Sequence, residues 1–346
     1  MFKKLIGPSF TVGFINYSYC DYDKKLYEDN VRKTFTKKEF DKLFPNFKPY
    51  KILANDMIHN GYKYTYGINM VDEFRNYSTR KGGFHLVDEI DVSNYLYYGG
   101  KLGIITIPDD ALIYLEEKKI KVNKLELNKV YDLKYYLNNI AGEQIKLNFV
   151  KNNGLLIKYI VNPSEAVQLK AVKENCLTIQ YIVNPTEAVQ LEAVKENGLA
   201  IQYIVDPSEV VQLKAVKKNG LAVQYIVNPS EVVQLEAVKK NGDALQYIKN
   251  PSEVVQLEAV KENCWVIKYI KNPNEAVQLE AVKENGLAIQ YIVNPNEIVQ
   301  LEAIKDDCVA LKYIKNPTKA VQLDADKKNC WRLINDLHIR NLLRYY

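Results

Sequence analysis

Eight prolines in the second half of this chain follow one another at intervals of 22 residues. They are Pro163, Pro185, Pro207, Pro229, Pro251, Pro273, Pro295 and Pro317. Around each of them the chain repeats a pattern close to Asn-Pro-Ser-Glu-Ala-Val-Gln-Leu-Glu-Ala-Val-Lys-Glu-Asn-Gly-Leu-Ala-Ile-Gln-Tyr-Ile-Val. A fixed period of this length indicates an array in which each unit buries its apolar face only against its neighbours. The pattern predicts an all-α solenoid of short helix-turn-helix repeats over residues 139–330 and excludes most enzyme classes there.

Each repeat carries a signal for the start of a helix. Asparagine or aspartate precedes the proline, and we expect it to cap free N–H groups while the proline takes the first helical position. Glutamate then falls at the third helical position in seven repeats, where it can complete a capping box. Lys319 replaces it in the eighth.

Two short helices are expected in every repeat. In the repeat of Pro185 they run from Pro185 to Glu196 and from Leu199 to Val205. Asn197 is expected to make the turn between them, because asparagine tolerates positive φ, and the small residue after it predicts close packing against the next unit. The expected core positions are Val189, Leu191, Val194, Ile201, Tyr203 and Ile204.

Residues that recur in every unit are best explained by the fold. The glutamine at position 190 and its equivalents are expected to hydrogen bond to neighbouring backbone. The tyrosine at position 203 and its equivalents are expected to be core aromatic residues with the hydroxyl at the edge. A row of rings for single-stranded nucleic acid is the alternative, and the low net charge, +5 for the whole chain, counts against it.

Positions that vary between units are where a partner would be recognised. Two of them, three residues apart on one face of the second helix, hold glutamine or lysine and valine or lysine respectively. The candidate partner-binding residues are Val161, Val183, Val205, Val227, Lys249, Lys268, Lys271, Lys312 and Lys315. This face changes from apolar to basic along the array and suits an acidic, amphipathic protein or peptide. The alternative is that the lysines only solubilise a helix edge.

Both ends of the array depart from the pattern. A degenerate leading unit has Leu147, Val150, Asn153 and Gly154 in register but no Asn-Pro start. Residues 331–346 abandon the repeat and predict an amphipathic capping helix over the last apolar face.

Four of the five cysteines, Cys176, Cys264, Cys308 and Cys330, stand where the other repeats have glycine. Equivalent positions on adjacent units should be roughly 8–10 Å apart, too far for a disulfide. We therefore expect them to remain unbridged, in a reducing intracellular setting. Their spacing does not fit a zinc site, and no metal or cofactor is expected. No apolar run reaches the length of a membrane span.

Residues 1–138 lack the repeat and predict an α+β domain. Thr36 to Glu39 form a capping box before a short helix. Strands are expected at 51–54, 62–66, 82–87, 103–108 and 121–127, and a helix at 91–98.

Four runs in this domain carry a resemblance: His59-Asn60-Gly61-Tyr62-Lys63-Tyr64, Gly82-Gly83-Phe84-His85, Tyr98-Gly99 and Ile105-Thr106-Ile107-Pro108-Asp109-Asp110-Ala111. They resemble the N-terminal domain shared by many repeat proteins of giant DNA viruses of the Mimivirus type, where it precedes ankyrin or other arrays. The repeat unit is similar to a short helical repeat known from such viruses and some intracellular bacteria. The resemblance implies a giant-virus protein in the host cell cytoplasm and brings no established activity.

The sequence therefore favours a non-catalytic scaffold that binds a protein or peptide. One enzyme alternative is kept for the N-terminal domain. The order Tyr64-Thr65-Tyr66-Gly67 followed by Gly83-Phe84-His85 faintly resembles an ADP-ribosyltransferase core. Its catalytic glutamate would be Glu116, Glu117 or Glu126, but the arginine or histidine expected on the first strand is absent.

Overall fold

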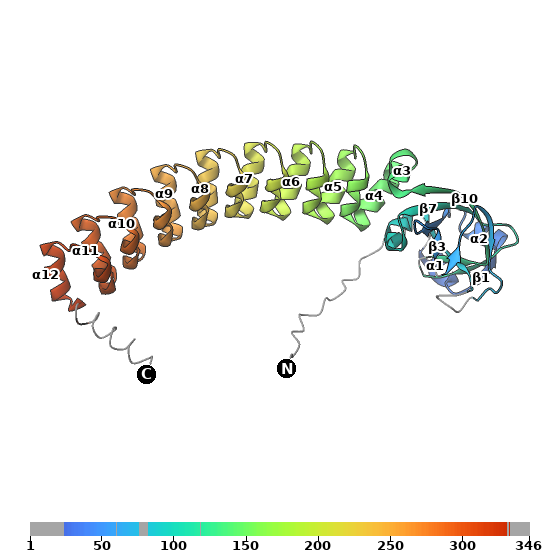
Figure 1. Ribbon diagram of the computed structural model, residues 1–346, viewed down its shortest axis with the longest axis horizontal. Coiled ribbons are helices and arrows are strands. Elements are labelled where there is room, and N and C mark those ends of the chain that lie inside the picture. Colours follow the sequence, from blue (N-terminus) through green and yellow to red (C-terminus); the bar gives the residue numbers. More distant parts are fainter. Residues whose placement is uncertain (1–23, 60, 76–81, 118, 331, 333–346) are drawn as a thin grey trace. The chain divides into compact units, whose positions relative to one another are not determined.

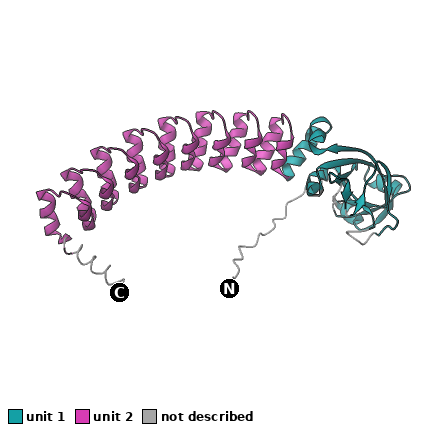
Figure 2. Ribbon diagram, in the orientation of Figure 1, with its two compact units in different colours: residues 1–152 teal, residues 153–346 magenta. Residues whose placement is uncertain are grey.

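A computed structural model describes residues 24–59, 61–75, 82–117, 119–330 and 332. The chain forms two compact units, residues 1–152 and 153–346, shown separately in Figure 2. The first unit is an α+β domain and the second is an array of helical repeats (Figure 1), as the sequence predicts. The expected capping helix at 331–346 lies almost wholly outside the described residues.

Antiparallel pairing joins eight strands of the first unit into one sheet, in the order β1-β8-β9-β6-β2-β7-β10-β5. Their bounds are β1 Thr34–Thr36, β2 Pro49–Leu53, β5 Gly67–Met70, β6 Phe84–Asp88, β7 Lys101–Thr106, β8 Leu112–Leu115, β9 Ile120–Val122 and β10 Lys124–Asp132. The remaining strands, β3 (Ile58–His59) and β4 (Tyr62–Lys63), pair as a hairpin. The expected strand at 121–127 is thus two strands, β9 and β10.

The described part of the first unit also has five helices: α1 (Lys24–Asn30), α2 (Lys37–Leu43), the 3₁₀ helix η1 (Glu89–Tyr98), α3 (Leu133–Asn139) and α4 (Glu143–Asn152). The capping box expected before α2 is present, with Thr36 and Glu39 bonded reciprocally. Phe40 and Phe44 from α2 and its C-terminal cap join the apolar cluster on one face of the sheet. The cluster also contains Leu53 of β2 and Phe84 of β6.

Side chains alternate along β2, as in any strand. Leu53 lies in the apolar cluster, whereas Tyr50 packs edge to face on Tyr136 of α3, with ring centroids 5.7 Å apart. Both tyrosine hydroxyls bond to Glu89 at the start of η1. The domain therefore buries both faces of its central strand.

The second unit repeats one pair of elements, a ten-residue α-helix and a six-residue 3₁₀ helix. The described α-helices are α5 Glu165–Glu174, α6 Glu187–Glu196, α7 Glu209–Lys218, α8 Glu231–Lys240, α9 Glu253–Glu262, α10 Glu275–Glu284, α11 Glu297–Asp306 and α12 Lys319–Lys327. The 3₁₀ helices are η2 Gly154–Tyr159, η3 Cys176–Tyr181, η4 Gly198–Tyr203, η5 Gly220–Tyr225, η6 Gly242–Tyr247, η7 Cys264–Tyr269, η8 Gly286–Tyr291 and η9 Cys308–Tyr313. Before them, α4 (Glu143–Asn152) and η2 occupy the places expected for the degenerate leading unit.

The expected assignment of the helix caps is wrong by two residues. Ser208, after the proline, is the N-cap of α7, and its hydroxyl accepts from the N–H of Val211. Asp206, before the proline, adopts φ 46° and turns the chain instead. Six equivalent asparagines share this conformation, which asparagine and aspartate tolerate because their short side chains can bond locally. They are Asn162, Asn184, Asn228, Asn250, Asn272 and Asn294.

The glutamate that follows this cap, Glu209 in α7, is consequently the first residue of the helix and not the third. It does not close a capping box. It bonds forward to the next repeat instead. Glu187 accepts from the hydroxyl of Ser208 at 2.5 Å, and Glu165 accepts from Thr186 at 2.7 Å.

The second asparagine of the repeat also differs from expectation. Asn197 has φ −142° and does not use the left-handed region. It caps η4 by accepting from the N–H of Leu199 at 3.0 Å. The second helix is a 3₁₀ helix with three residues per turn, so Gly198, Ile201 and Ile204 fall on one inward line.

Close packing at the glycine position is confirmed. A Cβ on Gly198 would lie 2.4 Å from the carbonyl oxygen of Ala215 in the next repeat.

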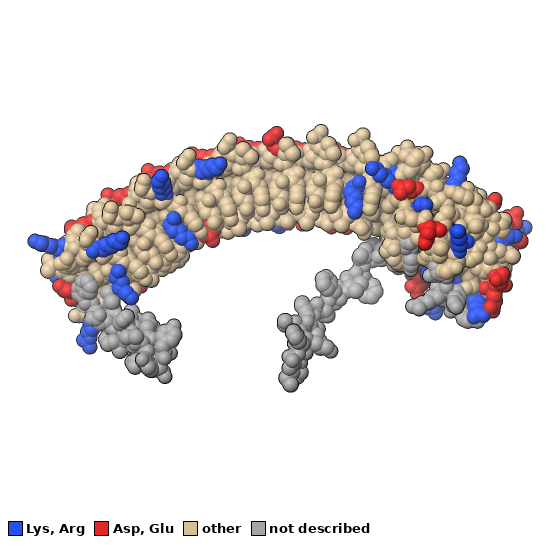
Figure 3. Space-filling model, in the orientation of Figure 1, with Lys and Arg blue, Asp and Glu red and all other residues tan. Residues whose placement is uncertain are grey.

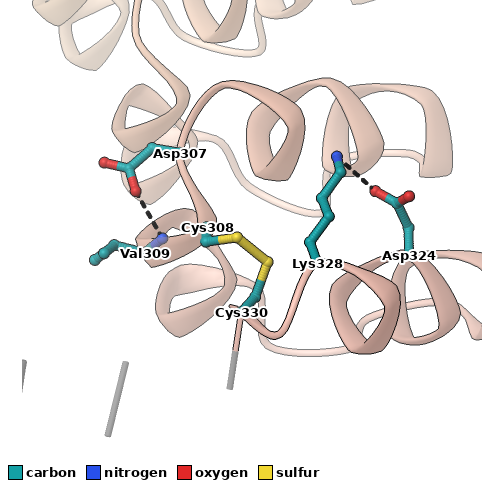
Figure 4. The surroundings of a disulfide bond; sticks show 6 residues. All are labelled: Asp307, Cys308, Val309, Asp324, Lys328 and Cys330. Atoms are coloured by element: carbon teal, nitrogen blue, oxygen red, sulfur yellow. Dashed lines mark hydrogen bonds and ion pairs between the residues drawn. A yellow bond between two sulfur atoms is a disulfide. The ribbon is translucent and has the colours of Figure 1, made fainter. Parts of the chain in front are cut away.

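The prediction that all cysteines in this position stay unbridged is wrong. Cys308 and Cys330, in successive repeats, form a disulfide with Cα atoms 5.0 Å apart (Figure 4). The expected 8–10 Å is the distance between packed helix axes, and these two Cα atoms lie closer together than that.

Candidate partner-binding face of the repeat array

The Gln/Lys position is the fifth residue of each 3₁₀ helix. In η4, Gln202 is exposed, and its side-chain N–H donates to the carbonyl oxygen of Leu199 at 3.0 Å. Where lysine replaces glutamine at positions 158 and 268, the amine lies over the ring of the tyrosine that follows. The Nζ atom of Lys268 lies 4.8 Å from the centroid of Tyr269. The position therefore offers an amide or a cation beside an aromatic ring.

The Val/Lys position lies two residues beyond the end of each 3₁₀ helix, at the corner that leads to the next repeat. Its valines are far more exposed than is usual for this residue type: 57% for Val161, 83% for Val183, and 85% for both Val205 and Val227. The five lysines among the candidate residues, Lys249, Lys268, Lys271, Lys312 and Lys315, are also exposed, as is Lys158 at the Gln/Lys position of the first unit. The expected exposure of this face is confirmed, while its role in binding remains a prediction.

The recurrent tyrosine is not the core residue that the sequence suggested. Seven of these side chains are 39–44% exposed: Tyr181, Tyr203, Tyr225, Tyr247, Tyr269, Tyr291 and Tyr313. Each is the last residue of its 3₁₀ helix, so three residues per turn places it off the inward line of Ile201 and its equivalents. We name this set the tyrosine row. It adds aromatic surface next to the predicted site residues.

One ring of the tyrosine row contacts an aromatic side chain of the preceding repeat. Trp265 of η7 meets Tyr291 of η8 edge to face, with centroids 6.2 Å apart and ring planes at 89°. Leucine stands at the position of Trp265 in most other repeats and is partly exposed, as in Leu177. Tyr291 is therefore held by an aromatic contact across the boundary between two repeats.

The recurrent glutamine of the α-helix has the structural role expected of it, but within its own unit. The side-chain N–H of Gln190 donates to the carbonyl oxygen of Pro185 at 2.9 Å, which ties the corner to the first turn of the helix. The same bond recurs in the other repeats, from Gln168 to Gln322. This glutamine is part of the fold and not of the candidate site.

Charge is unevenly distributed on the array. Figure 3 shows few charged side chains on this face of the middle repeats, and blue side chains, with red ones along the upper rim, toward the α12 end. The exposed valines belong mainly to the earlier repeats and the five lysines to the later ones. This arrangement matches the change from apolar to basic that the sequence predicts.

The first unit contains a separate cluster of titratable side chains. His85 Nε2 lies 3.2 Å from one carboxylate oxygen of Glu116, and Lys119 Nζ lies 3.2 Å from the other. Lys51 is only 3% exposed, donates to the carbonyl oxygen of His85 at 3.1 Å, and lies 5.3 Å from the centroid of the Tyr64 ring. Sequence reasoning missed Lys51, although a lysine within Pro49-Tyr50-Lys51-Ile52-Leu53 is an unusual component of an apolar strand.

Electrostatics in this cluster follow from burial. Burial, together with the charge of Lys119, lowers the pKa of Lys51 to about 7. Burial and then the charges of Lys51 and His85 lower the pKa of His59 to about 4. Burial opposes ionisation of Glu116, but the His85 hydrogen bond and the nearby cations leave its pKa lowered. Both carboxylate oxygens of Glu116 have a partner, one in His85 and the other in Lys119.

The structure brings some residues of the enzyme alternative together and leaves others apart: His85 pairs with Glu116, and Tyr64 packs on Phe84. Tyr64 is 3% exposed and packs on Phe84, whereas Tyr66 is 64% exposed. Glu126 lies within β10, where its backbone faces Thr106 and Ile68. The buried Lys51 amine is directed at a backbone carbonyl and an aromatic ring. The cluster of Lys51, His85, Glu116 and Lys119 therefore has a structural role: it provides partners for polar and charged groups inside the sheet domain.

No family model, curated protein or solved structure matches the chain. Within the described ranges, every helix is too short or too polar to cross a membrane.

Proposed function

We propose that this chain is a non-catalytic scaffold that binds a protein or peptide partner along the exposed face of its repeat array. One observation carries the proposal. Valines on successive repeats, at the same structural position, are more than four-fifths exposed in Val183, Val205 and Val227. Contiguous exposed apolar surface on a soluble protein marks an interaction site, because leaving it in water has a free-energy cost.

The partner that fits this face is amphipathic and acidic at one end. Its apolar part would cover the valines of the earlier repeats, and its carboxylates would meet the five lysines of the later ones. Those lysines lie at exposed positions, so they favour association rate and orientation more than affinity. General binding to nucleic acid is disfavoured, since a net charge of +5 over the whole chain provides little attraction for phosphate. A giant-virus origin and a place in the host cell cytoplasm belong to the same proposal.

The test changes Lys249, Lys268, Lys271, Lys312 and Lys315 to glutamine in the full-length chain. The side-chain stems remain, so melting should hardly change, but captured partners should be lost or should bind more slowly. Wild-type binding should also weaken with added salt, because salt screens exposed charges.

A matched control changes five exposed lysines of the α-helices to glutamine: Lys173, Lys239, Lys240, Lys261 and Lys283. This control alters net charge equally but leaves the candidate face intact, and it should retain the partners. Salt-insensitive binding with the same partners in both variants would exclude this face and direct attention to the N-terminal domain.

A further inference from the structure

The last described helix of the array, α12, is attached differently from the helices before it. Each of α5 to α11 packs against the 3₁₀ helix that precedes it in the chain, as α7 does against η4. By contrast, α12 packs against α11 but makes little contact with η9. The corner between η9 and α12 differs as well, because Asn316 lacks the positive φ that Asp206 and its six equivalents adopt. The regular packing of the array therefore ends at α11.

A polar link between repeats is also missing at α12. In four repeats the hydroxyl of the N-cap residue bonds to the first glutamate of the preceding helix, as Ser208 bonds to Glu187. Thr318 is the N-cap of α12, and among the described residues its hydroxyl bonds only within its own helix. Its N–H donates to Oε1 of Gln300 over a long 3.3 Å. Polar contacts therefore replace little of the missing packing.

The disulfide joins the two elements that pack so little on each other. Cys308 is the first residue of η9, and Cys330 follows the end of α12 (Figure 4). The other cysteines of the array, Cys176 and Cys264, have glycine at the equivalent position in both neighbouring repeats and remain free. Within the described repeats, this cross-link is thus confined to the place where regular packing ends.

The same place carries part of the candidate face. Lys312 belongs to η9, and Lys315 stands in the corner between η9 and α12. Both side chains are exposed, whereas Ile314 between them is 7% exposed and anchors the start of the corner. The other end of the corner is held only as firmly as α12 is. The arrangement of these two lysines therefore depends on what ties α12 to η9.

We propose that Cys308 and Cys330 form a thiol–disulfide latch that holds α12 against η9 and fixes the basic end of the candidate face. This inference rests on the proposed scaffold function and adds a regulation to it. In the oxidised chain Lys312 and Lys315 keep one arrangement, and in the reduced chain the corner is released. A fixed arrangement loses less conformational entropy on binding, so the oxidised chain binds an acidic partner more tightly.

The chemistry is exchange with a small thiol such as glutathione. Cys308 is partly exposed and Cys330 is fully buried, so a thiolate attacks the Cys308 sulfur and the Cys330 sulfur leaves. A second thiol then displaces the first one from Cys308. Two small thiols become one small disulfide, while the protein disulfide takes up two electrons and two protons. Packing of α12 on α11 keeps the two cysteines close, so the reverse exchange can form the bond again.

A redox titration of the full-length chain tests the latch. The chain is equilibrated in different ratios of reduced to oxidised glutathione, starting from either form, and its thiols are alkylated after unfolding and identified by mass spectrometry. Cys308 and Cys330 should change together and reach the same end point from both directions. Burial raises the pKa of the Cys176 and Cys264 thiols, so these should stay reduced throughout. A bond that resists the most reducing buffer, or that does not form again, would overturn the proposal.

Amide hydrogen exchange measures what the bond holds in place. Reduction should speed exchange in α12 and in the corner after Ile314 at least about tenfold, and it should leave α8 unchanged. Cys308→Ser should exchange like the reduced wild type without any reductant. The control Cys264→Ser should behave as the wild type does in both redox states. A corner that exchanges equally fast in oxidised and reduced chains would contradict the latch.

Binding is measured by anisotropy, with a labelled peptide that has leucines over one half and glutamates over the other. The oxidised chain should bind it about threefold or more tightly than the reduced chain, as expected for two exposed ion pairs. The double change Lys312→Gln and Lys315→Gln should weaken binding and abolish its redox dependence, while exchange in α12 still responds to reductant. The matched control Lys249→Gln and Lys268→Gln removes the same charge and should weaken binding but keep the redox dependence.

The results distinguish failure of the latch from failure of the scaffold proposal. Equal binding by oxidised and reduced chains would overturn the regulation and leave the scaffold proposal in place. Redox dependence that persists after Lys312→Gln and Lys315→Gln would overturn the assignment to the basic end. No binding by either form, with no partner captured by the wild-type chain, would overturn the scaffold proposal and the regulation together.

Discussion

The hydroxyl of Ser208 donates to the carboxylate of Glu187 in the preceding repeat at 2.5 Å. The same hydroxyl accepts from the N–H of Val211, so one side chain both caps its own helix and joins two repeats. Equivalent bonds join Ser230 to Glu209 and Ser252 to Glu231. Asn274 and Asn296 cap the next two helices through their side-chain oxygens, at serine-equivalent positions.

This double role can be separated by substitution. Ser208→Ala removes the cap and the link to Glu187, and should lower the free energy of unfolding by about 1–2 kcal/mol. Ser208→Asn keeps the cap, as Asn274 does, and should cost less than half as much. Urea denaturation of the full chain measures both. Equal losses for the two variants would show that the cap contributes nothing.

The corner asparagine stabilises the array through its backbone and not as a cap. Asn228 has φ 49°, where a side chain with Cβ is strained unless it bonds locally. Asn228→Ala should therefore cost about 1 kcal/mol, whereas Asn228→Gly should cost clearly less, because glycine adopts this conformation freely. Lys249→Ala, at an exposed site, should cost under ~0.5 kcal/mol. Indistinguishable melting shifts for Asn228→Ala and Lys249→Ala would contradict this assignment.

The disulfide should stabilise the last described repeat. Cys308 and Cys330 are 22 residues apart, and closing a loop of this length restricts the unfolded chain by about 3 kcal/mol. Cys330→Ala, or a reductant added to the wild type, should make the region around α12 exchange its amide hydrogens faster. Reductant should have no further effect on the variant.

A matched control is Cys264→Ala, since Cys264 is a free, buried cysteine in an equivalent position. Its exchange pattern around α12 should still respond to reductant. Protection of α12 that is identical in oxidised and reduced wild-type protein would contradict a stabilising role for the bond.

The buried Lys51 should make the stability of the N-terminal domain depend on pH. The pKa of Lys51 is lowered from 10.5 to about 7 on folding, so between these values the unfolded chain binds more protons than the folded one. Stability should consequently rise as pH increases from about 7 toward 10.5. Below pH 7 the full cost of burying the charge is present.

Lys51→Met should therefore stabilise the domain at pH 6, by on the order of a few kcal/mol, and flatten the rise between pH 7 and 10. Lys63→Met, at an exposed position, is the control and should leave the pH profile unchanged. Thermal unfolding followed across this pH range measures the effect. A wild-type profile that falls with pH in this window, and is unaltered by Lys51→Met, would exclude this account.

Much of the fold follows from short-range patterns. The capping box at Thr36 and Glu39 involves residues three apart, and it is present as expected. The strand around Lys51 and the two-helix repeat also follow from local pattern. The helix cap at Ser208 could not be chosen from sequence alone, because Asp206 two residues earlier is an equally good capping residue. In the structure Asp206 makes the turn with φ 46°, and Ser208 caps the helix while bonding to Glu187 of the preceding repeat.

Of the residues at the candidate site, some could be recognised from the sequence and others only from the structure. The variable Val205 and Lys249 positions were recognised because a site that accepts both residue types must reach solvent. The exposure of Tyr203 was missed, because it depends on helix type: three residues per turn aligns Ile201 with Ile204 and turns the tyrosine outward. Lys51 was missed because its partners, the carbonyl oxygen of His85 and the ring of Tyr64, lie in other segments of the chain. Nothing in the sequence around Lys51 indicates that they are close to its amine.

The amino-acid sequence by itself determined the period, the number of complete repeats, the two-part organisation and the gradient from valine to lysine. These are properties of the order of residues along one chain. The tertiary structure decided which residues cap, that Tyr203 is exposed, and that Cys308 reaches Cys330, whose Cα atoms are 5.0 Å apart. The cap at Ser208 and the disulfide depend on contacts between neighbouring repeats, whose backbones approach closely at Gly198, whereas the exposure of Tyr203 depends on the 3₁₀ geometry of η4.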